Sequence, residues 1–293
     1  MIDLHTHTLY SDGTDEPIEL LKKAEEKGIE ILSITDHNTA KAYEILENIE
    51  VSEYFSGRII PGIELNTKIL GIPIEILGYG IDYKKMNELL PKYYLPAEER
   101  NRLEASKLVE KCKAAGIKLE ENCLDNYDAT YFASKFIQNE ILKFDENLKL
   151  FSKEALTDLK VFYRQFMSNP ECPLYLDPGE IIPDFDTAAN LIRECGGLVF
   201  IPHIFEYREN SRKILEYILK NHEFDGIECY YTTFTEEQTE ELVLLCKERG
   251  IYMSGGSDYH GKAKPDVDLA TGYGNLNIKK DVIGNWDGSF FQV

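Results

Sequence analysis

The sequence predicts an α/β protein in which a parallel sheet or barrel is interrupted by a helical insertion. Short apolar runs alternate with helical periods before residue 84 and again after residue 180, whereas the residues between are mostly helical in pattern. The chain has 293 residues, of which 43% are hydrophobic and 29% charged. A barrel of alternating strands and helices uses about 250 residues, so this length accommodates both a barrel and an insertion.

The first part of the chain begins with a short strand candidate and a helix. The strand spans residues 2–4, and the helix, TDEPIELLKKAEEKG, has Pro17 in its first turn and Gly28 at its end. The elements predicted next are a strand at 29–34, a helix from 39 to about 49, and strands at 58–64 and 72–80. This alternation is typical of a parallel sheet or barrel.

The periodicity changes after residue 83. Residues 97–115 form a continuous helical pattern, and further helix-like stretches follow with few strand signals. Alternation resumes with helices at 187–197, 211–221 and 235–250 and strands at 198–203, 225–231 and from 251. We therefore expect a barrel built from residues 1–83 and 181–293 and a helical insertion, residues 84–180, that covers the functional site.

The charge and cysteine content argue against several classes of protein. The chain carries 32 basic and 52 acidic residues, a formal net charge of -20, which disfavours a long nucleic acid as partner. A small phosphate ester remains compatible, because bound divalent cations reverse the local charge. No apolar run approaches the roughly 18 residues of a membrane span and no secretion signal is visible, so we expect a cytoplasmic protein with no membrane partner. The 6 cysteines include no CxxC pair, which argues against a cysteine-bound zinc ion, and the oligomeric state stays open.

Most of the histidines follow predicted strands directly, together with acidic residues. They are His5 and His7 after the first strand, Asp36 and His37 after the second, Glu64 at the end of the third, His203 after the insertion, and Asp258 and His260 after the last strand. In an α/β barrel the active site is built at the carboxyl ends of the strands. His222, which lies at a helix end, is interpreted as a structural residue.

The spacing of these residues predicts metal binding. His5 and His7 are two residues apart, so an extended backbone directs both imidazoles to one face. Asp258 and His260 repeat this spacing on another strand. Mixed nitrogen and carboxylate ligands suit zinc, manganese or iron, whereas calcium prefers oxygen ligands. Asp12, in the YSDG stretch, is a further candidate ligand, for which a plain turn is the alternative.

The motifs DLHTHTLYSDG, TDHN, PGIEL, FIPH and GGSDYHG resemble those of the PHP family, named for its polymerase-associated and histidinol phosphatase members. The stretches EILGYGID (75–82) and FDGIECYYTTFTEEQTEELVLLCKERG (224–250) resemble a subfamily of stand-alone bacterial phosphoesterases with a helical insertion. Members of that subfamily hydrolyse nucleotide phosphates, including 3′,5′-bisphosphates. The resemblance implies a distorted seven-stranded barrel that holds two or three divalent metal ions, with manganese, iron and zinc as candidates.

The resemblance also implies a ligand set for each ion. The first would bind His5, His7, Glu64 and Asp258, the second Glu64 and His203, and the third Asp12, His37 and His260. Asp36 is expected to orient a ligand or a loop.

One motif of the subfamily is missing from this chain. Subfamily members usually carry an Arg-Pro-His run inside the insertion, and its counterpart here is Ala129, Thr130 and Tyr131. No histidine occurs between His37 and His203, so the usual insertion ligand and its neighbouring arginine are both replaced. Two interpretations of Tyr131 stay open, a weak phenolate ligand and an ordinary packed tyrosine.

The sequence therefore predicts a metal-dependent phosphoesterase for a small phosphorylated metabolite, a nucleotide mono- or 3′,5′-bisphosphate. Asp258, His203 and His260 are the candidates for proton transfer to the leaving oxygen. The candidates for substrate binding are Arg100, Arg102, Arg208, Lys262 and Tyr131. Two alternatives stay open: an amidohydrolase that uses the same metals, and a metal-binding protein whose activity is lost or altered because the Arg-Pro-His run is missing.

Overall fold

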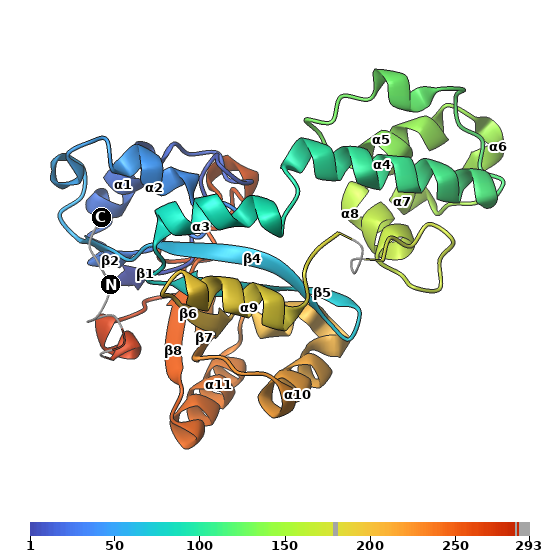
Figure 1. The fold of residues 1–293 in the computed structure, drawn as a ribbon. Helices are drawn as coiled ribbons and strands as arrows, with labels where there is room; N and C mark the ends of the chain where they lie inside the picture. Colours follow the sequence, from blue (N-terminus) through green and yellow to red (C-terminus); the bar gives the residue numbers. More distant parts are fainter. Residues whose placement is uncertain (178–180, 285, 287–293) are drawn as a thin grey trace. The chain divides into compact units, whose positions relative to one another are not determined.

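The computed structural model describes residues 1–177, 181–284 and 286, and the chain divides into two compact units (Figure 1). The first unit consists of Met1–Tyr93 and Ile182–Val293, and the second of Tyr94–Ile181. The second unit thus begins at Tyr94, whereas the sequence pattern predicts an insertion from residue 84. The predicted end of that insertion, residue 180, lies outside the described residues.

The strands of the described residues form two sheets, one of three strands and one of five. The three-stranded sheet is parallel and contains β1 (Ile2–Asp3), β2 (Ile31–Leu32) and β3 (Arg58–Ile59). The five-stranded sheet contains, in spatial order, β4 (Gly62–Ile69), β5 (Ile72–Tyr79), β6 (Leu198–Ile201), β7 (Gly226–Tyr231) and β8 (Tyr252–Gly256).

The second sheet is mixed, so the prediction of a single parallel sheet or barrel is wrong in this part. β4 pairs antiparallel with β5, and β5 pairs antiparallel with β6, while β6, β7 and β8 are parallel. The hairpin between β4 and β5 turns at Leu70 and Gly71, whose φ angles of 54° and 76° are those of a two-residue hairpin turn. The predicted strand 58–64 is divided between β3 and β4 at Pro61, which has no amide hydrogen to donate to a sheet.

Isolated bridges connect the two sheets on both sides. Thr6, just after β1, pairs with Tyr259, just after β8, and His37, after β2, pairs with Glu64 in β4. The strand pairing of the described residues thus gives two bridged sheets and does not by itself show the distorted seven-stranded barrel that the resemblance implies.

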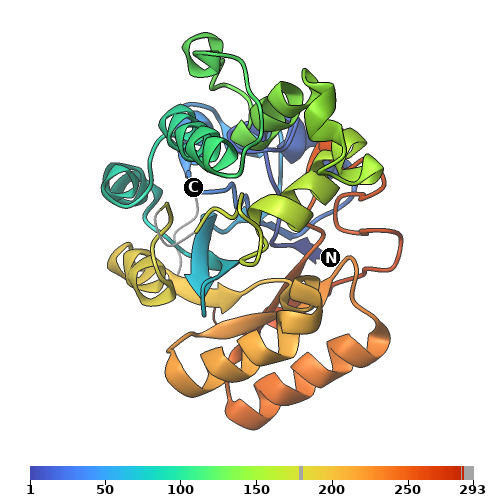
Figure 2. The same cartoon turned by 90° about the vertical axis from the view of Figure 1, so that its right-hand side faces the viewer.

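Five of the six α-helices in the described part of the first unit follow the sequence prediction, whereas Tyr83–Leu89 was predicted only as part of the helical insertion. Those six helices are α1 (Pro17–Glu26), α2 (Lys41–Leu46), α3 (Tyr83–Leu89), α9 (Phe185–Glu194), α10 (Ser211–Asn221) and α11 (Glu236–Arg249). Thr235 and Gln238 form the predicted capping box at the start of α11. Helices α10 and α11 lie side by side in both views (Figures 1 and 2), and Arg212 joins them through Glu241 at 2.5 and 2.9 Å.

The second unit is helical, and its described part contains no strand. Its helices are α4 (Ala97–Ala114), α5 (Ala133–Leu142), α6 (Asp145–Leu148), α7 (Lys153–Thr157) and α8 (Leu159–Phe162). They pack around their own apolar core, in which Leu108, Ile137 and Phe162 are fully buried. None of the described helices is both long and apolar enough to cross a membrane.

The core of the first unit fixes the start of the chain. Ile2 and Leu4 are fully buried beside Tyr79 and Phe200, and the Tyr79 hydroxyl donates a hydrogen bond to the Leu4 carbonyl oxygen at 3.0 Å. Burial of one such aliphatic side chain contributes roughly 1.5–3 kcal/mol. The residues that follow Leu4 are therefore held firmly at the carboxyl end of β1.

Candidate metal centre

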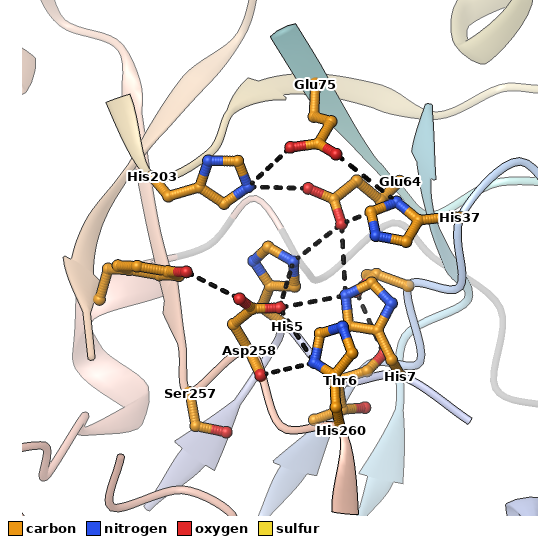
Figure 3. A network of polar contacts seen from close by, with 12 residues as sticks. His5, Thr6, His7, His37, Glu64, Glu75, His203, Ser257, Asp258 and His260 are labelled. Atoms are coloured by element: carbon orange, nitrogen blue, oxygen red, sulfur yellow. Dashed lines mark hydrogen bonds and ion pairs between the residues drawn. The ribbon is translucent and has the colours of Figure 1, made fainter. Parts of the chain in front are cut away.

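The carboxylate of Glu64 lies at the centre of a buried cluster of histidine and acidic side chains (Figure 3). Four imidazoles surround this carboxylate. Its Oε1 atom lies 2.9 Å from His203 Nε2. Its Oε2 atom lies 3.1 Å from His5 Nε2, 3.2 Å from His7 Nε2 and 3.4 Å from His37 Nδ1. These histidines follow β1, β2 and β6, and Glu64 lies in β4. Segments far apart in the sequence thus meet at one carboxylate.

Asp258 forms the second acidic side of the cluster. Its Oδ1 atom lies 3.5 Å from His5 Nε2, 3.3 Å from His7 Nε2 and 3.4 Å from His260 Nδ1. The backbone φ of Asp258 is 57° and that of His203 is 28°, values that cost of order 1–3 kcal/mol in residues other than glycine. Hydrogen bonds hold both residues in these conformations. The Asp258 N–H donates to the His5 carbonyl oxygen at 2.8 Å, and the His203 N–H donates to Oε2 of the buried Glu228 at 2.8 Å.

Asp12 completes the predicted set on a third side. Its Oδ1 lies 3.1 Å from His260 Nε2 and 3.6 Å from His7 Nδ1, and its Oδ2 lies 3.7 Å from His37 Nε2. Burial raises the pKa of Asp12, but the neighbouring His260, His37 and His7 lower it well below its usual range. The structure therefore brings together the histidine and acidic residues that the sequence identified as candidate metal ligands.

The donor atoms of this cluster fit divalent cations. Three groups have donor atoms that all lie within 4.8 Å of one another: His7, Asp12, His37 and His260; His5, His7 and Glu64; and His37, Glu64 and Glu75. The buried His7 Nε2 and His37 Nδ1 atoms form no hydrogen bond among the described residues, although Glu64 Oε2 lies only 3.2 and 3.4 Å from them. An unsatisfied buried polar atom costs about 1–3 kcal/mol, a cost that a bound cation removes. The nitrogen and carboxylate donors suit zinc, manganese or iron.

In the absence of metal, the carboxylates favour protonated histidines. Burial lowers the pKa of His7, but Asp258 and Glu64 raise it to about 10. Burial also lowers the pKa of His203, but Glu64 and Glu75 raise it to about 9. Burial raises the pKa of Glu64, yet His5 and His37 lower it well below the usual value. Positive charge is thus required among these acids, and protons supply it when no cation is bound.

Glu228, in the interior of β7, is an important residue that the sequence analysis missed. It is fully buried, its Oε1 lies 2.9 Å from His5 Nδ1, and its Oε2 accepts a hydrogen bond of 2.8 Å from the His203 backbone N–H. This contact favours a hydrogen on His5 Nδ1, which makes Nε2, the nitrogen that faces Glu64 and Asp258, the one available to a metal ion. The sequence signal that could have identified Glu228 is that it is the single acidic residue inside the otherwise apolar strand GIECYY.

Glu75, in β5, is a second residue that was missed. Its Oε2 lies 3.4 Å from His203 Nε2, and its Oε1 lies 3.9 Å from His37 Nδ1. Burial and the nearby Glu64 raise the pKa of Glu75. Because Asn66 pairs with Glu75 across the antiparallel β4–β5 hairpin, Glu75 shares the face of Glu64, two residues before Asn66. This relationship follows from the hairpin, which the alternation pattern did not predict.

The outer oxygen of Asp258 is also held. The Tyr231 hydroxyl donates to Oδ2 at 2.7 Å, and the Lys264 ammonium donates to the same oxygen at 2.5 Å.

Asp36 accepts hydrogen bonds from the Thr8 N–H and hydroxyl at 2.7 and 2.6 Å and from the Ser11 hydroxyl at 2.6 Å. Asp36 therefore fixes the loop that leads to Asp12.

The residues predicted to bind substrate lie outside these contacts or in the other unit. Arg208 and Lys262 belong to the first unit, and their side chains are exposed. Arg100, Arg102 and Tyr131 belong to the second unit, where the Tyr131 side chain is exposed. His222 is outside the cluster, with Nδ1 at 2.7 Å from Asp186 Oδ1, in keeping with its interpretation as a structural residue.

Comparisons with known proteins identify the family of the chain. The chain is 26% identical to a 5'-3' exoribonuclease of Haemophilus influenzae, over 97% of both chains. It is 25% identical to a 3',5'-nucleoside bisphosphate phosphatase of Chromobacterium violaceum, over 92% of this chain and 90% of the relative. The solved structure of an amidohydrolase from Chromobacterium violaceum shares the fold, with a TM-score of 0.62 at 21% identity, over 92% of this chain and 89% of that chain. The model of the PHP domain matches residues 3–153, and the chain belongs to the PHP domain family.

Proposed function

We propose that this protein is a metal-dependent phosphoesterase whose substrate is a small phosphorylated nucleotide, a nucleoside monophosphate or 3′,5′-bisphosphate. The observation that carries the proposal is the convergence of histidine and carboxylate donors on Glu64, with buried nitrogens that lack hydrogen-bond partners. Membership of the PHP domain family and the relative named a 3',5'-nucleoside bisphosphate phosphatase support it.

The ligand sets of the proposed centre combine the predicted residues with one addition. The first ion would be held by His5, His7, Glu64 and Asp258, the second by Glu64, His203 and Glu75, and the third by Asp12, His37 and His260. Manganese, iron and zinc are the candidate ions. Bound at this site, they would stabilise negative charge on the phosphoryl group and lower the pKa of a coordinated water.

The chain's own residues orient the site and handle protons. Glu228 holds His5 in the tautomer that presents Nε2, and Tyr231 holds Asp258 so that Oδ1 faces the histidines. Asp258, His203 and His260 are the proposed groups for proton transfer to the leaving oxygen. His260 contacts the Asp258 carbonyl oxygen through Nδ1 at 2.8 Å, an arrangement that leaves Nε2 directed toward the open side of the cluster at Asp12.

We propose further that the two sheets act as one distorted barrel. Besides the bridges Thr6–Tyr259 and His37–Glu64, the Leu4 N–H donates to the Gly255 carbonyl oxygen at 3.2 Å, which ties β1 to β8. This arrangement supports a site at the carboxyl ends of the strands, where barrels of this class build their active sites.

A second candidate is the removal of nucleotides from the 5′ end of a short RNA. The relative named a 5'-3' exoribonuclease matches 97% of this chain, which favours this candidate. The net charge of -20 disfavours a long polyanion, so any RNA substrate should be short. The amidohydrolase reaction has only a likeness of fold in its favour.

Phosphate release from a substrate panel tests the proposal. The protein would be stripped with a chelator, reloaded with manganese, and incubated with nucleoside monophosphates, 3′,5′-bisphosphates, 5′-phosphorylated oligoribonucleotides and an N-acyl amino acid. We expect the protein to release phosphate from a mononucleotide or bisphosphate. This release should be abolished in Asp258→Ala and unchanged in Asp266→Ala, which replaces an exposed aspartate nearby in the sequence. Shortening of the oligoribonucleotide would instead favour the exoribonuclease, and hydrolysis of the amide alone would contradict both.

A further inference from the structure

Lys264 brings a positive charge to the edge of the cluster. Its Nζ atom lies 2.5 Å from Asp258 Oδ2, while Asp258 Oδ1 faces His5 and His7 on the other side of the carboxylate. The Lys264 side chain is 41% exposed, whereas that of Asp258 is only 9% exposed. The ammonium therefore reaches a buried metal-ligand candidate from the solvent side.

The turn that carries Lys264 is held in place by tight packing. Lys264 directly follows the short 3-10 helix Gly261–Ala263, and its N–H donates to the Gly261 carbonyl oxygen at 3.3 Å. A Cβ atom at Gly261 would lie 2.3 Å from Thr14 Oγ1, so the turn rests directly on the loop beside Asp12. Its Lys262 N–H also donates to Thr14 Oγ1, at 2.8 Å. These contacts fix the backbone at Lys264, and the ion pair with Asp258 then places its ammonium group.

We propose that Lys264 binds a phosphoryl oxygen of the substrate, an inference that rests on the proposed phosphoesterase function. An ammonium group has three donor hydrogens, and Asp258 takes one of them, which leaves two for a ligand on the open side. A phosphoryl oxygen placed beside Asp258 would meet this ammonium.

The alternative role for Lys264 is to orient Asp258 alone. The Tyr231 hydroxyl already donates to Asp258 Oδ2 at 2.7 Å, so the carboxylate keeps one partner without the lysine. Replacement of Lys264 should therefore leave the metal content intact while it weakens phosphate binding. The two roles are separable by experiment.

The test uses inorganic phosphate as the probe and the manganese-loaded full chain. Metal content and calorimetric phosphate binding would be measured for the parent, Lys264→Met, Lys264→Arg and the control Lys213→Met, an exposed lysine of α10. We expect Lys264→Met to keep the parental metal content and to bind phosphate about tenfold more weakly, the loss of one charge-assisted hydrogen bond. Lys264→Arg should restore most of the affinity, and KM for the substrate should rise more than kcat falls.

Phosphate affinity unchanged in Lys264→Met, or phosphate that fails to bind the parent, would overturn the proposal. Loss of metal from Lys264→Met would also overturn it and assign the lysine to the orientation of Asp258. If the parent binds phosphate through Lys264 yet hydrolyses no phosphate ester, the proposed function fails while the assignment of Lys264 as a phosphate-binding residue stands.

Discussion

Glu228 Oε1 lies 2.9 Å from His5 Nδ1, and the other oxygen of the same carboxylate accepts a hydrogen bond from the His203 backbone N–H. One buried side chain of β7 thus orients two candidate ligands from two other strands. Both contacts require an acceptor, and a carboxylate offers two acceptor oxygens. A glutamine would offer one oxygen and one donor amide, and so could satisfy only one contact.

The variant Glu228→Gln should therefore bind metal about 10–100-fold more weakly than the parent. If the glutamine oxygen accepts from His203, its amide faces His5 Nδ1 and favours the tautomer with hydrogen on Nε2, the nitrogen that faces Glu64 and Asp258. Competition with a fluorescent chelator would measure the affinity, with Glu248→Gln, an exposed residue of α11, as the control. Equal affinities in the variant and the parent would show that Glu228 has no orienting role.

Removal of metal should lower the thermal stability of the protein. A ligand at about 100 times its dissociation constant stabilises the native state by about 2.7 kcal/mol, because it binds the folded chain only. For a chain of 293 residues that corresponds to a fall of roughly 4 °C in Tm on chelation. Differential scanning calorimetry with and without EDTA would measure it. The shift should be largely absent in His7→Ala, and a shift of equal size in that variant would place the metal elsewhere.

The metal-free protein should lose stability between about pH 6 and pH 10. The pKa of His7 is about 10 and that of His203 about 9 in the folded state, against 6.5 for an ordinary histidine. Because the pKa of each histidine is higher in the folded than in the unfolded state, protonation stabilises the fold fully at a pH below the unfolded pKa of 6.5. This stabilisation is lost as the pH rises through the folded pKa values of about 9 and 10. Urea unfolding across this range would detect the loss. A metal-free protein that gains stability toward pH 10 would contradict these protonation states.

Asp36 should control the site through the loop rather than through contact with an ion. Its carboxylate accepts from Thr8 and Ser11, so Asp36→Ala should free the loop that positions Asp12. We expect that variant to lose affinity for one ion, the one assigned to Asp12, and to keep binding at His5 and Glu64. Manganese titration followed by electron paramagnetic resonance would count the sites. Loss of all sites together would argue that the variant is misfolded, which circular dichroism would reveal.

Much of the candidate site is predictable from local sequence, because the ends of short strands are visible as a change from apolar to polar residues. His5 and His7 follow the apolar start of β1, and His203 follows LVFI, so their meeting at one edge was expected from strand direction alone. Asp36 was likewise expected to orient a ligand or loop, and its contacts with Thr8 and Ser11 are of that kind.

The residues that were missed depend on relationships between strands. Glu75 reaches the cluster because β4 and β5 form an antiparallel hairpin, while the alternation of strands and helices suggested parallel strands. Glu228 lies within a strand rather than after it, and its two partners, His5 and the His203 backbone N–H, follow two other strands. Lys264 and Lys262 are indistinguishable by composition, and only the turn after His260 directs one of them to Asp258.

The most direct test of the account is a paired measurement of metal content and phosphate release on His7→Ala, with His222→Ala as a histidine control outside the cluster. We expect two or three manganese ions per parent chain. His7→Ala should hold fewer ions and release no phosphate from a nucleoside 3′,5′-bisphosphate, whereas His222→Ala should keep the parental values. Parental metal content and activity in His7→Ala would show that the cluster around Glu64 is not the metal centre.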